Sequence, residues 1–414
     1  MTRIKIKPIT SYLAISILLF TLAPYGYAKK KKKEDAPAPK KAVQIDHSKI
    51  DTSKLVWPLP PDVPRIKFLQ EIYGENKPPV PAGQKGKKKQ SWMDRVAGMQ
   101  TTDNGSLKKD YVHMLARPYG IGVDSKKRVY VADSFVSAVF VFDLDKKETK
   151  LLRNGAEGKF GTIIGLTVDS ADRLFVVDAL LHRVAVFSPD WKLEAYFGDD
   201  HLEHGGGIAI DEENRFLYVV DTGAQRVAVF DADSFKFLRY IGGPPKSVGD
   251  EDAGVLSKPS NVAVDNEGIV YVSDTMNNRI QIFDADGKFI SMFGKAGDGP
   301  GDFARPKGIA IDPDNHVWVA DAFTNRVQIF DREGHLLGFF GTGGDLPGQF
   351  GVPSGVYVDK NNRAFVTEQL HGRLQVFRYF TEAEAKVMKE QKDKKSTAAV
   401  SAQSAPQTAA EGKK

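Results

Sequence analysis

The most frequently repeated polar motif in this chain is an acidic residue followed five positions later by an arginine. A carboxylate and a guanidinium at this spacing can form a charge-assisted hydrogen bond, either as a catalytic couple or as a brace within a loop. A catalytic site needs only one copy, so the repetition predicts that the pairs are structural. The pairs are Asp178 and Arg183, Asp221 and Arg226, Asp274 and Arg279, Asp321 and Arg326, and Glu368 and Arg373.

Metal ligands are the second kind of chemistry to consider. The candidates are His182, His204 and His371 for zinc, and Asn261 for calcium or zinc. The three histidines occupy unequal positions in their repeats, and the other repeats carry glycine where Asn261 stands. The stretch from Asp284 to Gly287 starts like a calcium loop, but Lys295 stands where a bidentate glutamate is needed, so a hairpin turn is predicted. We therefore expect no catalytic residue, no metal and no cofactor, and these four residues are the ligands to test if zinc or calcium is bound.

Six repeats must position all of these residues. Each repeat holds a short apolar segment ending in Asp, a polar turn, a β-rich segment and a third segment with alternating apolar positions. The first Asp of each falls 42 to 54 residues after the previous one, a period that is typical of a four-stranded propeller blade. The repeats are Pro118–Phe142, Ile163–Phe187, Gly205–Phe230, Pro259–Phe283, Pro306–Phe330 and Pro353–Phe377.

The sixth repeat ends near Phe380 without a fourth strand of its own. The segment Ile66–Tyr73 aligns with the fourth strands of other repeats and can supply the missing one. Such pairing would close the ring and remove two open sheet edges. The fold class predicted is therefore all-β, a six-bladed β-propeller whose last blade is completed by an N-terminal strand.

The repeats resemble the NHL-repeat six-bladed β-propeller family. Hallmark stretches are Phe293–Gly297, Pro306–Asp312, Val319–Asp321 and Asn325–Phe330, and the resemblance covers roughly residues 117–380. It implies the fold but leaves the function open, since the family includes protein binders, RNA binders and some enzymes. Related enzymes resemble this architecture too: the amidating lyase holds zinc through histidines of several blades, and the lactonase and paraoxonase types hold calcium at the axis.

The loops entering each first strand and those joining the second strand to the third should share one face, here called the loop face. Basic and apolar side chains concentrate there despite a repeat region with 29 Lys and Arg against 38 Asp and Glu. Such a surface favours contact with a protein or an acidic polymer, although the apolar side chains could equally pack against one another or against a neighbouring insertion. The candidate binding residues are Arg117, Tyr119, Phe135, His204, Lys258, Met276, Arg305, Lys307, Phe323 and His371.

The chain is thus expected to be an exported, non-catalytic binding or scaffolding module whose partner is another envelope protein or an acidic polymer. The alternative is a metal-dependent hydrolase or lyase with its site in the axial funnel. RNA binding is less favoured, because a nucleic-acid-binding core should itself be basic.

The ends of the chain bear on localisation. Residues 1–28 read as a signal peptide, with Arg3, Lys5 and Lys7 before an apolar run, which indicates the periplasm, the cell surface or secretion. The lysines at 29–33 leave an uncleaved N-terminal anchor as the alternative. The expected domains are a Lys/Ala/Pro-rich linker over 29–56, the propeller over 57–380 with a basic insertion at 75–116 that can hold a short helix, a charged helix over 381–395, and a disordered tail over 396–414.

Overall fold

A computed structural model describes residues 50–59, 62–75, 113–155, 158–245 and 253–403. The signal peptide, most of the linker, the body of the insertion with its expected helix, and residues 404–414 lie outside these ranges. The residues from His47 to Lys414 belong to one compact unit. No helix among the described residues is both long enough and apolar enough to cross a membrane.

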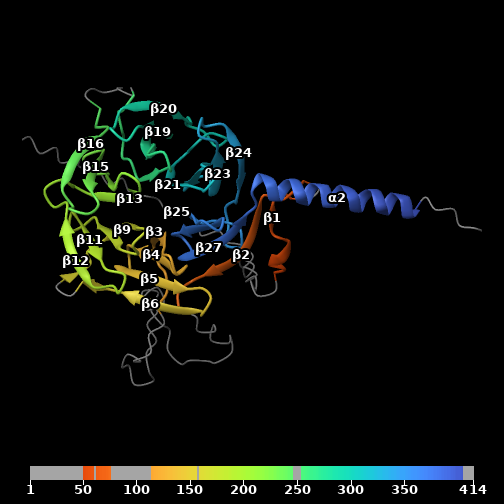
Figure 1. Ribbon diagram of the computed structural model, residues 1–414, viewed down its shortest axis with the longest axis horizontal. Coiled ribbons are helices and arrows are strands. Elements are labelled where there is room, and N and C mark those ends of the chain that lie inside the picture. The colour runs from red at the N-terminus through yellow and green to blue at the C-terminus, as the bar shows by residue number, and fades with distance from the viewer. Residues whose placement is uncertain (1–49, 60–61, 76–112, 156–157, 246–252, 404–414) are drawn as a thin grey trace, which may run out of the picture. The chain divides into compact units, whose positions relative to one another are not determined.

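The repeats fold into antiparallel blades arranged around a common axis (Figure 1). Runs rich in valine, isoleucine and aromatic residues form the second and third strands, which are almost wholly buried. The first five blades are β3 (Pro118–Val123), β4 (Val129–Asp133), β5 (Ala138–Asp143) and β6 (Glu148–Leu152); β9 (Ile163–Val168), β10 (Leu174–Asp178), β11 (Arg183–Phe187) and β12 (Leu193–Phe197); β13 (Gly205–Asp211), β14 (Phe216–Asp221), β15 (Arg226–Asp231) and β16 (Phe237–Ile241); β17 (Asn261–Val264), β18 (Val270–Asp274), β19 (Arg279–Phe283) and β20 (Phe289–Phe293); and β21 (Pro306–Ile311), β22 (Val317–Asp321), β23 (Arg326–Phe330) and β24 (Leu336–Phe340).

The sixth blade confirms the predicted closure. It consists of β25 (Pro353–Val358), β26 (Arg363–Glu368) and β27 (Arg373–Tyr379), with β2 (Ile66–Ile72) as its fourth strand. In β2, Phe68 lies opposite Phe377 of β27. The first strands contact one another in the order β3, β9, β13, β17, β21, β25 and back to β3, so the ring is complete. The fold is therefore an all-β six-bladed propeller.

One further strand extends this blade. β1 (Val56–Trp57) pairs with β2, and the short helix η2 (Thr52–Lys54) precedes it. Leu55 and Trp57 pack against the core between blades five and six. The predicted boundary between linker and propeller at residue 57 is therefore too late, because this apolar pair gains burial by joining the sheet.

The apolar core lies between blades rather than inside them. Each hydrophobic cluster combines residues of two neighbouring blades; for example, Trp318 of the fifth blade packs in one cluster with Val366 and Phe377 of the sixth. Six such clusters join the six pairs of adjacent blades. Each blade therefore depends on both neighbours for its burial.

The C-terminal helix differs from the prediction at its end. Helix α2 (Glu382–Gln403) begins with a capping box, in which the Glu384 amide donates to Oγ1 of Thr381 and Thr381 donates to the Glu384 carboxylate. It continues past residue 395 through Ser396–Gln403, which was expected to be disordered tail. This stretch holds three alanines, the residue that favours a helix most, and proline comes only at 406.

Three short elements complete the described part. The strands β7 (Asn154–Gly155) and β8 (Gly158–Lys159) form a small hairpin before the second blade. The helix η3 (Thr275–Asn277) forms the loop between β18 and β19. The two ends of the insertion are held together, because Gly74 and Met114 form a β-bridge and the Glu75 amide donates to the His113 carbonyl.

Candidate functional site

Acidic residues at the ends of the second strands hold the loops of the loop face. In the first blade, the buried Asp133 carboxylate accepts hydrogen bonds from the backbone amides of Ala116, Arg117, Phe135 and Val136, at 2.7 to 3.0 Å. Burial raises the pKa of Asp133 above its ordinary value. One carboxylate thus fixes both the loop that carries Arg117 and the loop that carries Phe135.

The same arrangement recurs in the other blades. Asp321 accepts from the amides of Ala304, Arg305, Phe323 and Thr324. Asp178 and Asp221 bind the corresponding amides of their own blades. The acidic half of the repeated motif therefore positions the loop face.

The arginine half of the motif has two kinds of environment. In three blades the predicted pairs are ion pairs: Arg226 with Asp221 at 3.7 Å, Arg279 with Asp274 at 2.8 Å, and Arg373 with Glu368. In the other two, the guanidinium lies over an aromatic ring of the fourth strand, as that of Arg226 also does over Tyr240. Arg183 is 3.6 Å from the centre of the Tyr196 ring, and Arg326 is 5.5 Å from that of Phe339.

The loop face exposes large apolar side chains from five of the six blades. None of the residues in the loops between second and third strands, at 134–137, 179–182, 222–225, 275–278, 322–325 and 369–372, is Asp, Glu, Lys or Arg. The cations Arg117, Lys258 and Arg305 are exposed at the entry to the first strands, as is His204. Phe135 is 50% exposed, Met276 59%, Phe323 74%, Leu370 69% and Leu180 60%.

Tyr119 and Lys307 were predicted to lie on this face, but the structure places them inward, at the axis. Tyr119 is only 8% exposed, and Ser260 of the opposite blade lies near its hydroxyl. The Lys307 ammonium lies 5.8 Å from the centre of the Tyr119 ring. Burial raises the pKa of Tyr119 to about 12, whereas burial and the nearby Arg305 lower the pKa of Lys307. Tyr119 therefore crosses the axis beneath the loop face.

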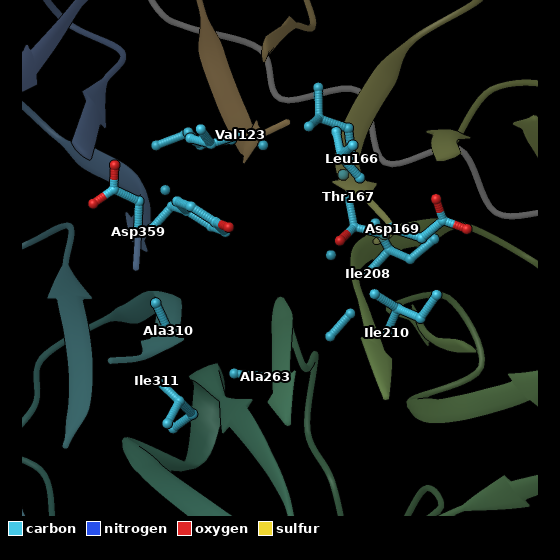
Figure 2. A pocket seen from close by; sticks show the side chains of 18 of the residues that line it. Val123, Leu166, Thr167, Asp169, Ile208, Ile210, Ala263, Ala310, Ile311 and Asp359 are labelled. Carbon is cyan, nitrogen blue, oxygen red and sulfur yellow. The ribbon is translucent and has the colours of Figure 1, made fainter. Parts of the chain in front are cut away.

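Below Tyr119, the six first strands enclose a cavity of about 570 Å³, here called the axial funnel (Figure 2). Its wall combines aliphatic side chains, among them Val123, Leu166, Ile208, Ala263 and Ile311, with polar groups that are concentrated toward its mouth. It opens on the face opposite the loop face, where the turns between first and second strands lie. The face that carries these turns is here called the turn face.

Glycines narrow the funnel at its inner end. A side chain at Gly120 would place its Cβ 2.7 Å from the Ile164 carbonyl oxygen, and one at Gly355 would come 2.0 Å from that of Tyr119. Both distances are shorter than any van der Waals contact. The repeated glycines that could be read as empty ligand positions instead allow the first strands to approach one another.

The structure does not bring the four candidate metal ligands together. His182 and His204 are exposed, and Nδ1 of His371 lies 2.9 Å from Glu368. Oδ1 of Asn261 accepts from the Val262 amide and faces Gly207. Among the residues that the structure describes, the one group of three with ligand atoms close enough for a metal is Asp331, Glu333 and His335, on an exposed hairpin turn.

Sequence reasoning expected an axial funnel but did not identify its lining residues, its opening on the turn face or the role of Tyr119. One signal was available, because Tyr119 is the only aromatic residue at its repeat position; the others are Ile164, Gly206, Ser260, Lys307 and Ser354. A large side chain at one of six positions around an axis is able to fill the centre. The width of the funnel depends on how closely the strands approach, which one repeat alone does not show.

Known proteins share this architecture. Residues 251–409 match a family model described as a 6-bladed beta-propeller. Protein lin-41 of Caenorhabditis elegans is 49% identical over 51 residues, which are 12% of this chain and 4% of that protein. The probable peptidyl-alpha-hydroxyglycine alpha-amidating lyase pgal-1 of the same organism is 34% identical over 91 residues, 22% of this chain and 25% of that protein. The chain thus spans a quarter or less of the length of these relatives.

A solved structure supports the fold alone. It is that of a protein of unknown function from Bacteroides thetaiotaomicron, with a TM-score of 0.52 and 16% identity, covering 68% of this chain and 73% of that one. Together with the six observed blades, these matches place the chain in the structural class of six-bladed β-propellers.

Proposed function

Since the chain is a six-bladed β-propeller of the NHL type, we propose that it is a non-catalytic binding module whose loop face holds an acidic segment of another protein. The proposal places this activity outside the cytoplasm, in the periplasm or at the cell surface, because residues 1–28 have the pattern of a signal peptide. A protein partner in the cell envelope is the corresponding expectation.

The observation that supports it best is the set of exposed apolar side chains on one face. Phe135, Met276, Phe323 and Leu370 are each at least half exposed although they sit on loops that buried carboxylates hold in place. Large apolar side chains exposed together, and fixed before contact, are typical of protein interaction surfaces.

Charge favours an acidic partner. In the part of the chain that the structure describes, Arg117, Lys258 and Arg305 form no ion pair, and the loops between second and third strands carry no Asp or Glu. The carboxylates of the loop face lie in the entry loops, among them Asp298 and Asp302 beside Arg305. These cations are available to steer and pair with an acidic segment.

The test is binding of a fluorescein-labelled peptide of alternating glutamate and leucine, followed by anisotropy. The triple variant Arg117→Gln, Lys258→Gln, Arg305→Gln should bind about tenfold more weakly or worse, because three exposed ion pairs contribute up to about 1 kcal/mol each. The matched control removes three exposed lysines from turns of the opposite face, as Lys192→Gln, Lys236→Gln, Lys288→Gln. Equal weakening by both triple variants, or no weakening by the first, would overturn the proposal.

The match to the amidating lyase favours one other class, a metal-dependent hydrolase or lyase. Elemental analysis of protein purified without chelator separates this class from a binding module. About one zinc or calcium per chain, lost together with an activity on dialysis against chelator, would support the enzyme and direct attention to His182, His204, His371 and Asn261.

A further inference from the structure

We propose that the axial funnel is a second binding site, open on the turn face, for a small organic carboxylate with an apolar body. The site is separate from the loop face, because Tyr119 and the close approach at Gly120 and Gly355 lie between the two. The ligand would enter the funnel with its apolar end first, and its carboxylate would remain at the mouth of the funnel.

The wall of the funnel suits an apolar body. A cavity of about 570 Å³ falls within the range of small-molecule sites, roughly 300–1,000 Å³. Most of the side chains that line its depth are aliphatic, with Leu166, Ile208 and Ile311 around the axis and the small Ala263 and Ala310 leaving space between them (Figure 2). Thr167 and Asn261 add polar groups to this lining. Transfer of a hydrocarbon from water into this space is favourable at about 25 cal/mol per Å² buried.

The carboxylates around the mouth do not make it a cation site. Asp124, Asp169 and Asp359 are buried and each bonds an arginine of its own blade, namely Arg128, Arg173 and Arg363, at 2.5 to 2.8 Å. Glu212 bonds Ser170 and Arg215, and Asp172 accepts from the amide and hydroxyl of Ser125. These carboxylates are therefore already paired within the ring, where they link turns of neighbouring blades.

The cations left without an ion pair at the mouth are two lysines, beside Asp172, whose partner Ser125 is neutral. Lys127 of the first blade and Lys360 of the adjacent sixth blade are exposed, line the funnel and take part in no ion pair within the described ranges. Tyr357, also in the lining, comes from the sixth blade. Burial raises its pKa to about 12, so at neutral pH its hydroxyl remains a hydrogen-bond donor. Two ammonium groups and a phenol beside an apolar cavity are complementary to a carboxylate on an apolar body.

The experiment is isothermal titration calorimetry of the whole chain with decanoate, 1-decanol and decylamine, which share a hydrocarbon tail and differ in the head group. Decanoate should bind one per chain and more tightly than the alcohol, and decylamine should bind most weakly. The double variant Lys127→Gln, Lys360→Gln should weaken decanoate binding by about fivefold and leave decanol unchanged.

Two further variants locate the site. Ala263→Phe fills the funnel and should abolish binding of both decanoate and decanol, with folding checked by circular dichroism. Lys192→Gln, Lys288→Gln removes two exposed lysines of the turn face outside the funnel and should change neither affinity by more than about twofold. The proposal fails if decanoate does not saturate, if decylamine binds as tightly as decanoate, or if the two double variants weaken decanoate equally.

Discussion

The arginines that begin the third strands occupy equivalent positions in the repeats yet have very different surroundings. Arg373 is fully buried, bonds the carboxylates of Glu368 and Glu71, and donates to the carbonyls of Asp345 and Gln349. The two carboxylates come from strands β26 and β2, so this one guanidinium joins the closing strand to the blade. Arg373 and Glu368 are fully buried and Glu71 is partly exposed, and burial of the two charges is tolerated because they are paired.

Replacing this arginine should therefore be far more harmful than replacing its counterpart in the second blade. Arg373→Met leaves the buried Glu368 and the partly exposed Glu71 without their cation and should lower the free energy of unfolding by about 3–5 kcal/mol. Arg183→Met removes a partly exposed stack on Tyr196 and should lower it by about 1 kcal/mol. Urea unfolding monitored by circular dichroism measures both values. Equal losses of unfolding free energy in the two variants would show that the buried ion pair of Arg373 adds no stability beyond what an arginine contributes at this repeat position.

At the scale of the element, the closing strand β2 shows how alternation along a strand decides burial. Phe68 is 4% exposed and its ring meets that of Phe377 edge-on at 5.7 Å, whereas the neighbouring Leu69 is 43% exposed. Ile66 and Phe68 face the core and Lys67 between them does not, since successive side chains of a strand point to opposite faces. β2 pairs with β27 from Ile66 to Ile72, with a register shift between Phe68 and Gln70 that leaves Leu69 without a pairing partner and exposed.

This difference predicts the effect of two adjacent alanine substitutions. Phe68→Ala should lower the free energy of unfolding by about 3–5 kcal/mol, because it leaves a cavity in the hydrophobic cluster between the fifth and sixth blades. Leu69→Ala, one residue away on the exposed side, should change it by less than about 1 kcal/mol. Thermal unfolding of both variants beside the parent chain provides the measurement. A large loss in Leu69→Ala would mean that the outer side of β2 is covered in solution.

The elements that the sequence predicted are those with a strong local pattern. The alternation in β22 and β23, and the match of the Ile66–Tyr73 segment to other fourth strands, are visible within single repeats, and both were confirmed. Features that depend on neighbouring blades were not predicted. The pairing of β1, the position of Tyr119 across the axis and the width of the funnel all follow from how separate repeats pack together.

At the scale of the whole molecule, the hydrophobic clusters lie between blades and the ring has no terminal blade. In an open array of repeats, the end units have one neighbour and fray first. Here each blade has two neighbours, and strand β2, from the opposite end of the propeller sequence, completes the sixth. Loss of any one blade would expose two clusters at once, which couples the stability of all six.

We therefore expect the propeller to unfold in a single transition. The fluorescence of each of its tryptophans should report this same transition. Trp57 packs on Phe340 and Phe377, Trp191 donates a hydrogen bond to the Tyr130 hydroxyl of the first blade, and Trp318 packs on Tyr379 of the sixth.

Single-tryptophan variants, with the other tryptophans including Trp92 replaced by phenylalanine, report on these places separately in urea. Their fluorescence midpoints should each coincide with the midpoint that circular dichroism gives for the same variant, since a ring without ends has no blade that can leave first. Adding Phe68→Ala weakens the closure and supplies the control: the Trp57 signal, next to β2, should then change at a lower urea concentration than the Trp191 signal. Distinct fluorescence and circular dichroism midpoints with an intact closure would show that the blades unfold independently, and the coupling through shared clusters would then be too weak to hold the ring as one unit.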